Sequence, residues 1–185
     1  MTEPDTALQQ LRALVRDGNL RGALALLNAR TAHRFTSLYR FDDDTLRNVW
    51  FFDREHPERE TVEDIPVLAS YCVFVRDAHS TFRVDDAAAD ARVAEHPKRE
   101  QIRAYCGVPL LDRMGRMFGT ICHFDFRPLT ISDENVALME ALAPLLQRHS
   151  ARATGSGAGS PGPGSPAAPP CGPPSGAGGS PSPIR

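Results

Sequence analysis

The segment from Arg116 to Asp125 constrains the fold of this chain most, because it has the pattern of a long strand that is apolar on both faces. Side chains along a strand alternate between its two faces. The two sets of alternating residues are Met117, Gly119 and Ile121, and Phe118, Cys122 and Phe124. A strand of this kind is covered on both sides. The sequence therefore predicts a sheet that lies between two layers.

Helical patterns at both ends of the body predict one of these layers. A helix over residues 5–16 ends at Asp17–Gly18, since glycine accepts the left-handed conformation that ends many helices. Asn19 then caps a second helix, and Thr130 or Ser132 caps the last one. The three apolar stripes comprise Leu8, Leu11, Leu14 and Val15; Leu20, Ala23, Leu24 and Leu27; and Val136, Met139, Leu142, Leu145 and Leu146. We expect these helices to cover one face of the sheet.

Shorter elements lie between the helical ends. Further strands are predicted at residues 35–41, 45–52, 70–75, 81–85 and 105–111, and a short Ala-rich helix is predicted at 87–94. Hairpins dominate this order, so the sheet should be mainly antiparallel. We therefore expect an α+β fold, with the terminal helices on one face. A layer of loops and short helices from residues 54 to 104 should hold a pocket on the other face.

Composition divides the chain. Between residues 153 and 185, 24 of 33 residues are Gly, Pro or Ser. Such a stretch cannot bury enough apolar surface to offset the entropy of ordering it. We therefore expect an N-terminal helix at residues 1–18, one domain at 19–150 and a disordered tail at 151–185, with no output domain fused to it.

Charge and hydropathy exclude several function classes. The formal net charge is −2, whereas nucleic-acid binding needs a basic face, so we expect no nucleic-acid partner. No run of 18 apolar residues and no signal peptide are present, which predicts a cytoplasmic protein without a membrane partner. The four cysteines, Cys72, Cys106, Cys122 and Cys171, form no CxxC pair, so free thiols are expected. Phosphate loops, dinucleotide fingerprints, serine nucleophile elbows and metal-ligand spacings are missing as well.

Four motifs in order resemble the GAF family of sensory domains. They are Ser70-Tyr71-Cys72, Val84-Asp85-Asp86-Ala87, Tyr105-Cys106-Gly107-Val108-Pro109-Leu110 and Gly119-Thr120-Ile121-Cys122-His123-Phe124-Asp125. The family pattern has a Y-x-G-V-P-L strand, a glycine hairpin, a G-T-L-C-x-x-D strand and a closing amphipathic helix. The resemblance spans roughly residues 20 to 150. It implies a six-stranded antiparallel sheet between a helix layer and a ligand-sized cavity.

The resemblance also limits the ligand. Members of the family bind cyclic nucleotides, bilins, haem or small metabolites, and many dimerise through their terminal helices. Asp133-Glu134 lacks the Asn-Lys and Phe spacing of the nucleotide-binding members. Cys122-His123 lies inside a strand and not on the segment that carries a bilin, and adjacent strand residues point to opposite faces. Both ligands are disfavoured, and the sequence identifies no cofactor.

Seven residues are candidate ligand contacts. Each also has a plain structural interpretation. Trp50, Tyr71 and Tyr105 suit a pocket wall or a core, and Asp85 suits a ligand contact or a helix cap. His123 suits an acidic ligand or haem iron, but a buried histidine is more often satisfied by a carbonyl or carboxylate, such as Asp125. Cys72 and Cys106 are small buried groups or reactive thiols, and the same two interpretations hold for Cys122, which could meet them over the sheet.

Three functions follow. The first is a small-molecule-binding regulatory module that acts as a homodimer through its terminal helices. The second is a thiol enzyme that resembles free methionine sulfoxide reductase, which needs an attacking and a resolving thiol within disulfide reach. The family's G-V-C-G segment for that chemistry is absent. The third is a structural interaction domain with a filled pocket.

Overall fold

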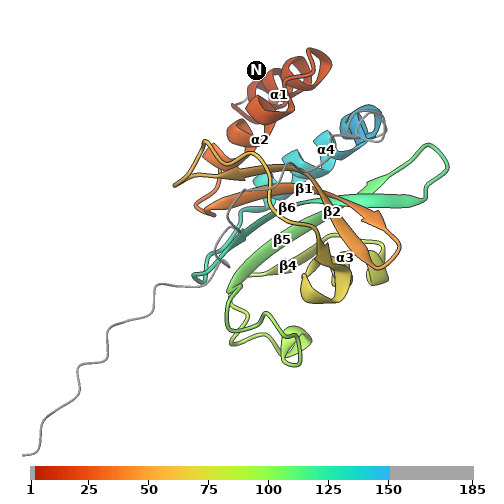
Figure 1. The fold of residues 1–185 in the computed structure, drawn as a ribbon. Coiled ribbons are helices and arrows are strands. Elements are labelled where there is room, and N and C mark those ends of the chain that lie inside the picture. Colours follow the sequence, from red (N-terminus) through yellow and green to blue (C-terminus); the bar gives the residue numbers. More distant parts are fainter. Residues whose placement is uncertain (1–2, 151–185) are drawn as a thin grey trace, which may run out of the picture.

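Six strands form one sheet. They are β1 (Phe35–Asp42), β2 (Thr45–Asp53), β3 (Ile65–Pro66), β4 (Phe82–Val84), β5 (Ala104–Leu111) and β6 (Met117–Asp125). Their order is β3-β2-β1-β6-β5-β4 (Figure 1), and each neighbouring pair described is antiparallel. The computed structural model describes the backbone of residues 3–150 and the side chains of residues 6–147. The predicted α+β fold is confirmed, and the predicted tail lies outside the described residues.

Three helices cover one face of the sheet: α1 (Glu3–Arg16), α2 (Leu20–Ala29) and α4 (Asp133–Ser150). The α2 helix packs against β1 and β2, α4 packs against β5, and α1 packs on the other two helices. The predicted ends are confirmed: Gly18 has a φ of 77°, and the Asn19 side chain accepts a hydrogen bond from the Gly22 N–H at 2.9 Å. Ser132 accepts one from the Asn135 N–H at 3.3 Å. Within residues 3–150, no helix is long and apolar enough to cross a bilayer.

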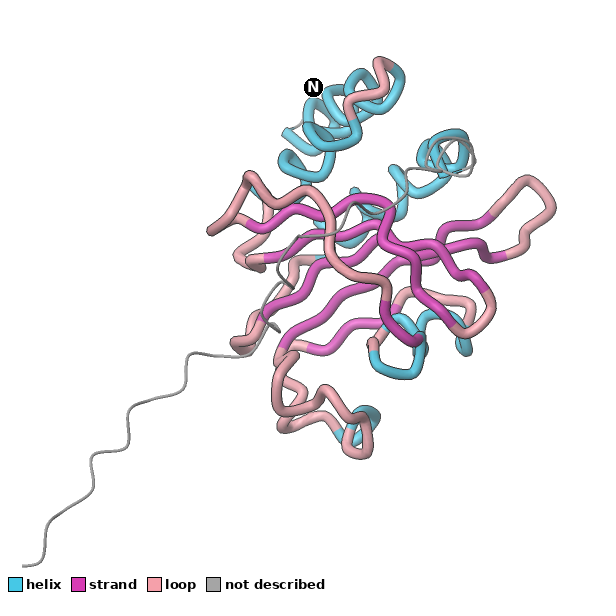
Figure 2. The backbone as a smooth tube through the Cα atoms, in the orientation of Figure 1, coloured by secondary structure: helices cyan, strands magenta, loops and turns pink. Residues whose placement is uncertain are grey.

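The opposite face is covered by α3 (Cys72–Ala78) and by two 3₁₀ turns, Val67–Ala69 and Ala91–Val93. Figure 2 shows helices on both sides of the strands. Two apolar clusters result, one on each face of the sheet. The cluster under α3 comprises Tyr39, Leu46, Val67, Tyr71, Cys72, Val73, Val75, Val84, Ala87, Val93, Tyr105 and Cys122. The layered arrangement predicted from the apolar strand at 116–125 is therefore present.

A bulge in β2 sets which side chains face α3. Leu38 of β1 pairs with Trp50, but the next residue, Tyr39, pairs with Asn48, so Val49 is an extra residue. An extra residue reverses the alternation of the strand. Leu46 thus belongs to the cluster under α3, whereas Trp50 packs against the helix layer.

The strand predicted at residues 70–75 is wrong, because Cys72–Ala78 is a helix. The segment is rich in β-branched and aromatic residues, which favour strands locally. Its buried residues include Tyr71, Cys72 and Val75, a spacing that suits one face of a helix. Burial against β5 and β6 overrides the local preference.

The helix predicted at residues 87–94 is also wrong, since only the turn Ala91–Val93 is helical and it is 3₁₀. The side chains of Asp86 and Asp90 accept hydrogen bonds from the N–H groups of Ala88 and Arg92, at 3.0 and 2.9 Å. Such bonds compete with a helix. The short strand Ile65–Pro66 was not predicted, since a segment of two residues carries no periodicity.

Candidate functional site

A cluster of thiols and hydroxyls lies between the sheet and α3. Cys72 begins α3, Tyr105 comes from β5, and Thr120 and Cys122 share one face of β6. The Tyr105 hydroxyl and the Thr120 hydroxyl each donate a hydrogen bond to the Cys72 sulfur at 3.3 Å. Cys122 lies beside these contacts, because it pairs with Gly107, over which the Tyr105 hydroxyl lies, and it belongs to the same buried cluster as Cys72. We call Cys72, Tyr105, Thr120 and Cys122 the thiol–hydroxyl cluster.

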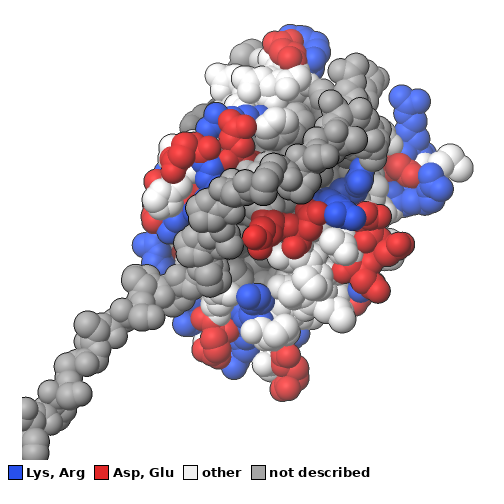
Figure 3. Space-filling view, viewed as in Figure 1, with Lys and Arg blue, Asp and Glu red and all other residues white. Residues whose placement is uncertain are grey.

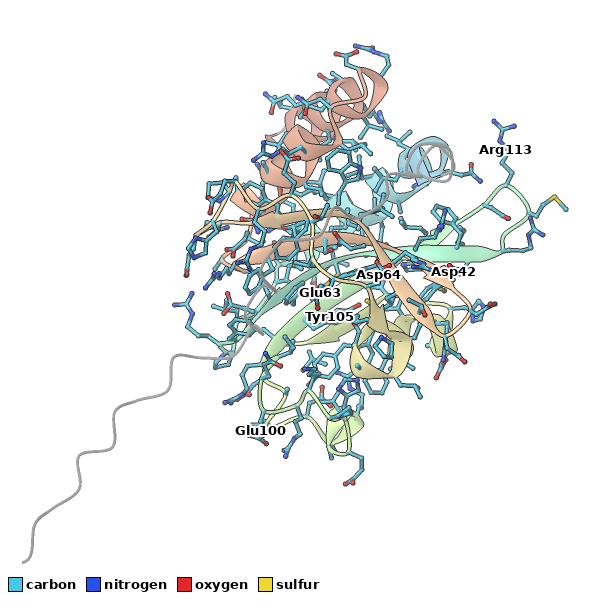
Figure 4. The ribbon with its side chains drawn as sticks, viewed as in Figure 1. Asp42, Glu63, Asp64, Glu100, Tyr105 and Arg113 are labelled. Atoms are coloured by element: carbon cyan, nitrogen blue, oxygen red, sulfur yellow. The ribbon has the colours of Figure 1, made fainter. Side chains whose placement is uncertain are left out.

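A glycine positions the tyrosine of this cluster. Tyr105 and Gly107 are two residues apart on β5, so they face the same side. A Cβ at Gly107 would lie 2.1 Å from the Tyr105 hydroxyl oxygen, so the ring lies directly over the glycine. The ring reaches across the strand toward α3 (Figure 4). The glycine of the Y-x-G-V-P-L motif thus gives Tyr105 the space to reach Cys72.

The cluster is buried, and its hydrogen bonds make the two thiols unequal. Burial opposes ionisation of Cys72, but hydrogen bonds with four neighbouring side chains outweigh it and lower the pKa of this thiol. These neighbours are Cys122, Ser70, Thr120 and Tyr105. The hydrogen bond to Cys72, followed by burial, raises the pKa of Cys122 well above its ordinary value. The arrangement therefore favours a Cys72 thiolate beside a protonated Cys122.

Aromatic rings close the cluster on its outer side. The Tyr71 ring lies 5.6 Å from the Tyr105 ring and 4.5 Å from the His96 ring, in edge-to-face geometry. Its hydroxyl donates a hydrogen bond to the Ile102 carbonyl at 3.2 Å, and burial raises the pKa of Tyr71 to about 12. Tyr71, Cys72 and Tyr105 are exposed by 2%, 0% and 3% of their surface, so side chains fill the space among them.

His123 lies on the opposite face of the sheet, as strand alternation predicts. Its Nδ1 lies 2.8 Å from the Thr36 hydroxyl, and its ring also hydrogen-bonds the Phe35 backbone. Burial lowers the pKa of His123 to about 3, with a smaller contribution from His33. The partners of the His123 ring are therefore the Thr36 hydroxyl and the Phe35 backbone. Asp125 instead accepts from the N–H groups of Arg34 and Arg127, at 2.8 Å each.

The structure thus divides the seven candidate residues among three places. Tyr71, Cys72 and Tyr105 come together under α3. Trp50, Cys106 and His123 lie on the helix-layer face, and burial raises the pKa of Cys106 to about 12. The sequence did not single out Thr120 or Cys122 as ligand contacts, although the two share one face of the predicted strand. That alternation was the available signal.

Asp85 lies in the third place, beside an open hollow of about 500 Å³. Its Oδ1 atom is buried, and no donor within the described residues bonds to it. The hollow is lined by Arg83, Asp85, Asp86, Ala89, Asp90, Ala91 and Arg92. A second hollow of about 600 Å³ lies between α4 and the β5–β6 hairpin, where Arg113 projects outward (Figure 4). Neither hollow is lined by the thiol–hydroxyl cluster.

The described residues contain no group of three or more His, Cys, Asp or Glu side chains arranged to hold a metal ion. On the face drawn in Figure 3, acidic and basic side chains are interspersed.

The thiol–hydroxyl cluster can do two things chemically. It can offer hydroxyl and thiol hydrogen bonds inside an aromatic enclosure, and it can supply a thiolate beside a second thiol.

Residues 19–148 match the model of the GAF domain. A cyclic di-GMP phosphodiesterase of Pseudomonas aeruginosa is 29% identical over 99 residues, which make up 50% of this chain but 17% of that protein. The chain therefore spans only a small part of this relative.

Two solved structures have the same fold. The GAF domain of an Acinetobacter phosphoenolpyruvate-protein phosphotransferase has a TM-score of 0.66 at 16% identity, over 85% of this chain and 98% of that chain. The free methionine-R-sulfoxide reductase of Neisseria meningitidis, in complex with its substrate, has a TM-score of 0.63 at 20% identity, over 82% and 91%. The family match covers most of the chain and agrees with the sheet and its two layers, so the chain belongs to the GAF domain family.

Proposed function

We propose that this chain is a sensory module that binds a small molecule between α3 and the sheet and acts as a dimer. The observation that carries the proposal is the thiol–hydroxyl cluster, where polar groups from α3, β5 and β6 converge inside an aromatic enclosure. Small-molecule sites combine apolar walls with a few convergent polar groups. GAF domains are in general sensory or ligand-binding, which supports the same function.

Binding at this place requires Tyr71 to move, because the enclosure is filled by side chains. Its hydroxyl donates a hydrogen bond to the Ile102 carbonyl. Moving Tyr71 breaks this hydrogen bond and exposes a ring that is 2% exposed, so the ligand must bury a comparable apolar surface in its place. The ligand would then replace the Tyr71 ring against Tyr105 and accept or donate hydrogen bonds to the cluster.

Native mass spectrometry tests this function. We expect the chain, purified under native conditions, to retain a small mass that is absent after denaturation. Tyr105→Phe removes one hydroxyl of the cluster and should reduce the retained fraction, whereas Trp50→Phe, on the opposite face, should leave it unchanged. A bare chain, with no stabilisation by any candidate metabolite, would overturn the proposal and favour the structural domain with a filled pocket.

A thiol-dependent reductase is the second candidate function, favoured by two cysteines, Cys72 and Cys122, that lie in one buried cluster under α3. The substrate to test is free methionine-R-sulfoxide, because the similar Neisseria protein is a reductase of this compound. We expect methionine to form with dithiothreitol as reductant if this function holds, and Cys72→Ser to abolish it. Turnover that persists in Cys72→Ser would exclude Cys72 as the attacking thiol.

A further inference from the structure

Two cysteines that are far apart in the sequence meet under α3. Cys72 is the first residue of α3, and Cys122 lies near the middle of β6. The Tyr105 hydroxyl donates to the Cys72 sulfur and lies over Gly107, which pairs with Cys122, so the two cysteine side chains are neighbours in one buried cluster. They are exposed by 0% and 1% of their surface. Cys106, the third cysteine of the described residues, belongs to the helix-layer cluster on the other face. The fold therefore selects one pair out of the three cysteines.

The surroundings give the two sulfurs different roles. The Cys72 sulfur accepts hydrogen bonds from two hydroxyls, which stabilise a thiolate. The neighbouring Cys72 and burial raise the pKa of Cys122 well above its ordinary value, so its thiol stays protonated. A thiolate is the form of cysteine that reacts with peroxides, and a neighbouring thiol can then resolve the product. This asymmetry suits a two-step oxidation.

We propose that Cys72 and Cys122 form a reversible disulfide when the chain reacts with a hydroperoxide. The Cys72 thiolate attacks the outer oxygen of ROOH, the O–O bond breaks, and ROH leaves after protonation. The Cys122 sulfur then attacks the resulting sulfenic acid, the S–O bond breaks, and water leaves. In sum, two thiols are oxidised and one hydroperoxide is reduced to ROH and water. A dithiol reductant restores both thiols.

The reaction requires α3 to open, since both sulfurs are buried. This helix has seven residues and lies between a 3₁₀ turn and His79, which takes a left-handed conformation with a φ of 50°. Short elements of this kind open at lower cost than the sheet does. After oxidation, the S–S bond holds the first turn of α3 to β6, and the Tyr105 and Thr120 hydroxyls lose their thiolate acceptor. The position of α3 would then report the oxidation state.

The oxidant itself is the signal in this reaction, so no small-molecule ligand is needed. The test uses the full chain with Cys171→Ser, which removes the cysteine outside the described residues. The protein is treated with hydrogen peroxide, quenched, alkylated after denaturation and digested. We expect a linked pair of peptides carrying Cys72 and Cys122, a loss of two hydrogens in the intact mass, and reversal by dithiothreitol. Cys106 is the internal control and should be alkylated.

Three results would overturn the proposal: both thiols alkylated after treatment, Cys106 oxidised as readily as Cys72, or Cys72 oxidised to a sulfinic acid without a disulfide. Thr120→Val keeps the shape of the side chain but removes one donor, and should slow oxidation of Cys72 by roughly threefold or more. An unchanged rate would exclude the role of this hydroxyl. Because no step depends on a bound molecule, failure of the ligand experiment and failure of this one are distinguishable.

Discussion

At the scale of single residues, Cys122 and His123 are neighbours in β6 but contact different polar groups on opposite faces of the sheet. Cys122 meets Cys72 under α3, whereas His123 meets Thr36 under α2. His123 shares a buried polar region with a second histidine, His33. The two rings lie 6.2 Å apart, and the His33 Nδ1 lies 2.7 Å from the Thr31 hydroxyl. Neutral imidazoles suit such a region, and a buried positive charge would cost several kcal/mol.

Stability should therefore fall as the pH decreases. Burial lowers the pKa of both His33 and His123 in the fold, the latter to about 3, whereas an unfolded histidine titrates near 6.5. Below about pH 6.5 the unfolded chain binds protons that the folded chain excludes. Each such proton lowers the free energy of unfolding by about 1.4 kcal/mol per pH unit until the folded pKa is reached. Urea unfolding between pH 7 and pH 4 measures this slope.

The matched variants for this measurement are His123→Gln and His56→Gln. The first removes one buried imidazole and should reduce the slope by nearly one proton. The second changes a histidine whose side chain is 53% exposed and should leave the slope unchanged. An identical slope in His123→Gln and the unmodified chain would contradict the assignment.

At the scale of elements, the centre of the sheet depends on a close approach between β1 and β6. A Cβ at Gly119 would lie 2.1 Å from the Tyr39 carbonyl oxygen, which is a backbone atom. At Gly107 the obstructing atom is instead the end of the Tyr105 side chain. The two glycines therefore have different reasons to be small: one permits strand pairing, and the other makes room for a side chain.

Gly119→Ala should consequently be more destabilising than Gly107→Ala. The first must displace a strand and should cost roughly 3 kcal/mol or more, whereas the second can be relieved by rotating Tyr105, at about 1–2 kcal/mol. Denaturant unfolding measures both. Gly107→Ala should also break the hydrogen bond from Tyr105 to Cys72. Equal costs at the two positions would show that the contact at Gly119 relaxes more easily than the structure indicates.

The sequence predicted the long elements well, and local competition explains what it missed. The sequence located the strands at 105–111 and 116–125 and the junction between the first two helices at Gly18 and Asn19, because alternation and capping residues determine them locally. The helix at Cys72–Ala78 could not be found, since burial against the sheet decides it. This helix carries Cys72, one of the four residues of the thiol–hydroxyl cluster, so the sequence could not show which cysteine lies beside Cys72.

Part of the candidate site was predictable for a different reason. Strand alternation correctly separated Cys122 from His123, and it could have added Thr120. Strand alternation could not place Trp50 on the correct face of the sheet, because the bulge at Val49 reverses the alternation of β2. A bulge of this kind depends on pairing with a strand that is elsewhere in the chain, so a single sequence does not reveal it.

At the scale of the whole molecule, α1 and α4 lie side by side on the outer layer. Several of their apolar residues are only partly buried against the core within one chain: Leu8, Leu14, Val136 and Leu145. Partly exposed apolar stripes on adjacent helices suit a four-helix contact between two copies. The predicted homodimer uses this surface, and it stays a prediction.

Analytical ultracentrifugation at several protein concentrations tests the dimer. We expect a dimer for the unmodified chain and a weaker one, by roughly tenfold or more, when Leu14→Glu and Leu145→Glu are combined. The control is Met114→Glu, which changes a residue that is 79% exposed on the β5–β6 hairpin. A monomer at all concentrations, or equal weakening by the control, would contradict an interface made by these helices.

The bulge in β2 has one practical consequence for spectroscopy. Trp50 is the only tryptophan of the chain, and the bulge turns it toward the helix layer and away from α3. Its fluorescence therefore originates on one face of the sheet, whereas Cys72 and Cys122 lie on the other. A change in emission on oxidation or on ligand addition would mean that the event had been transmitted through the strands to the helices, and an unchanged emission would confine it to α3.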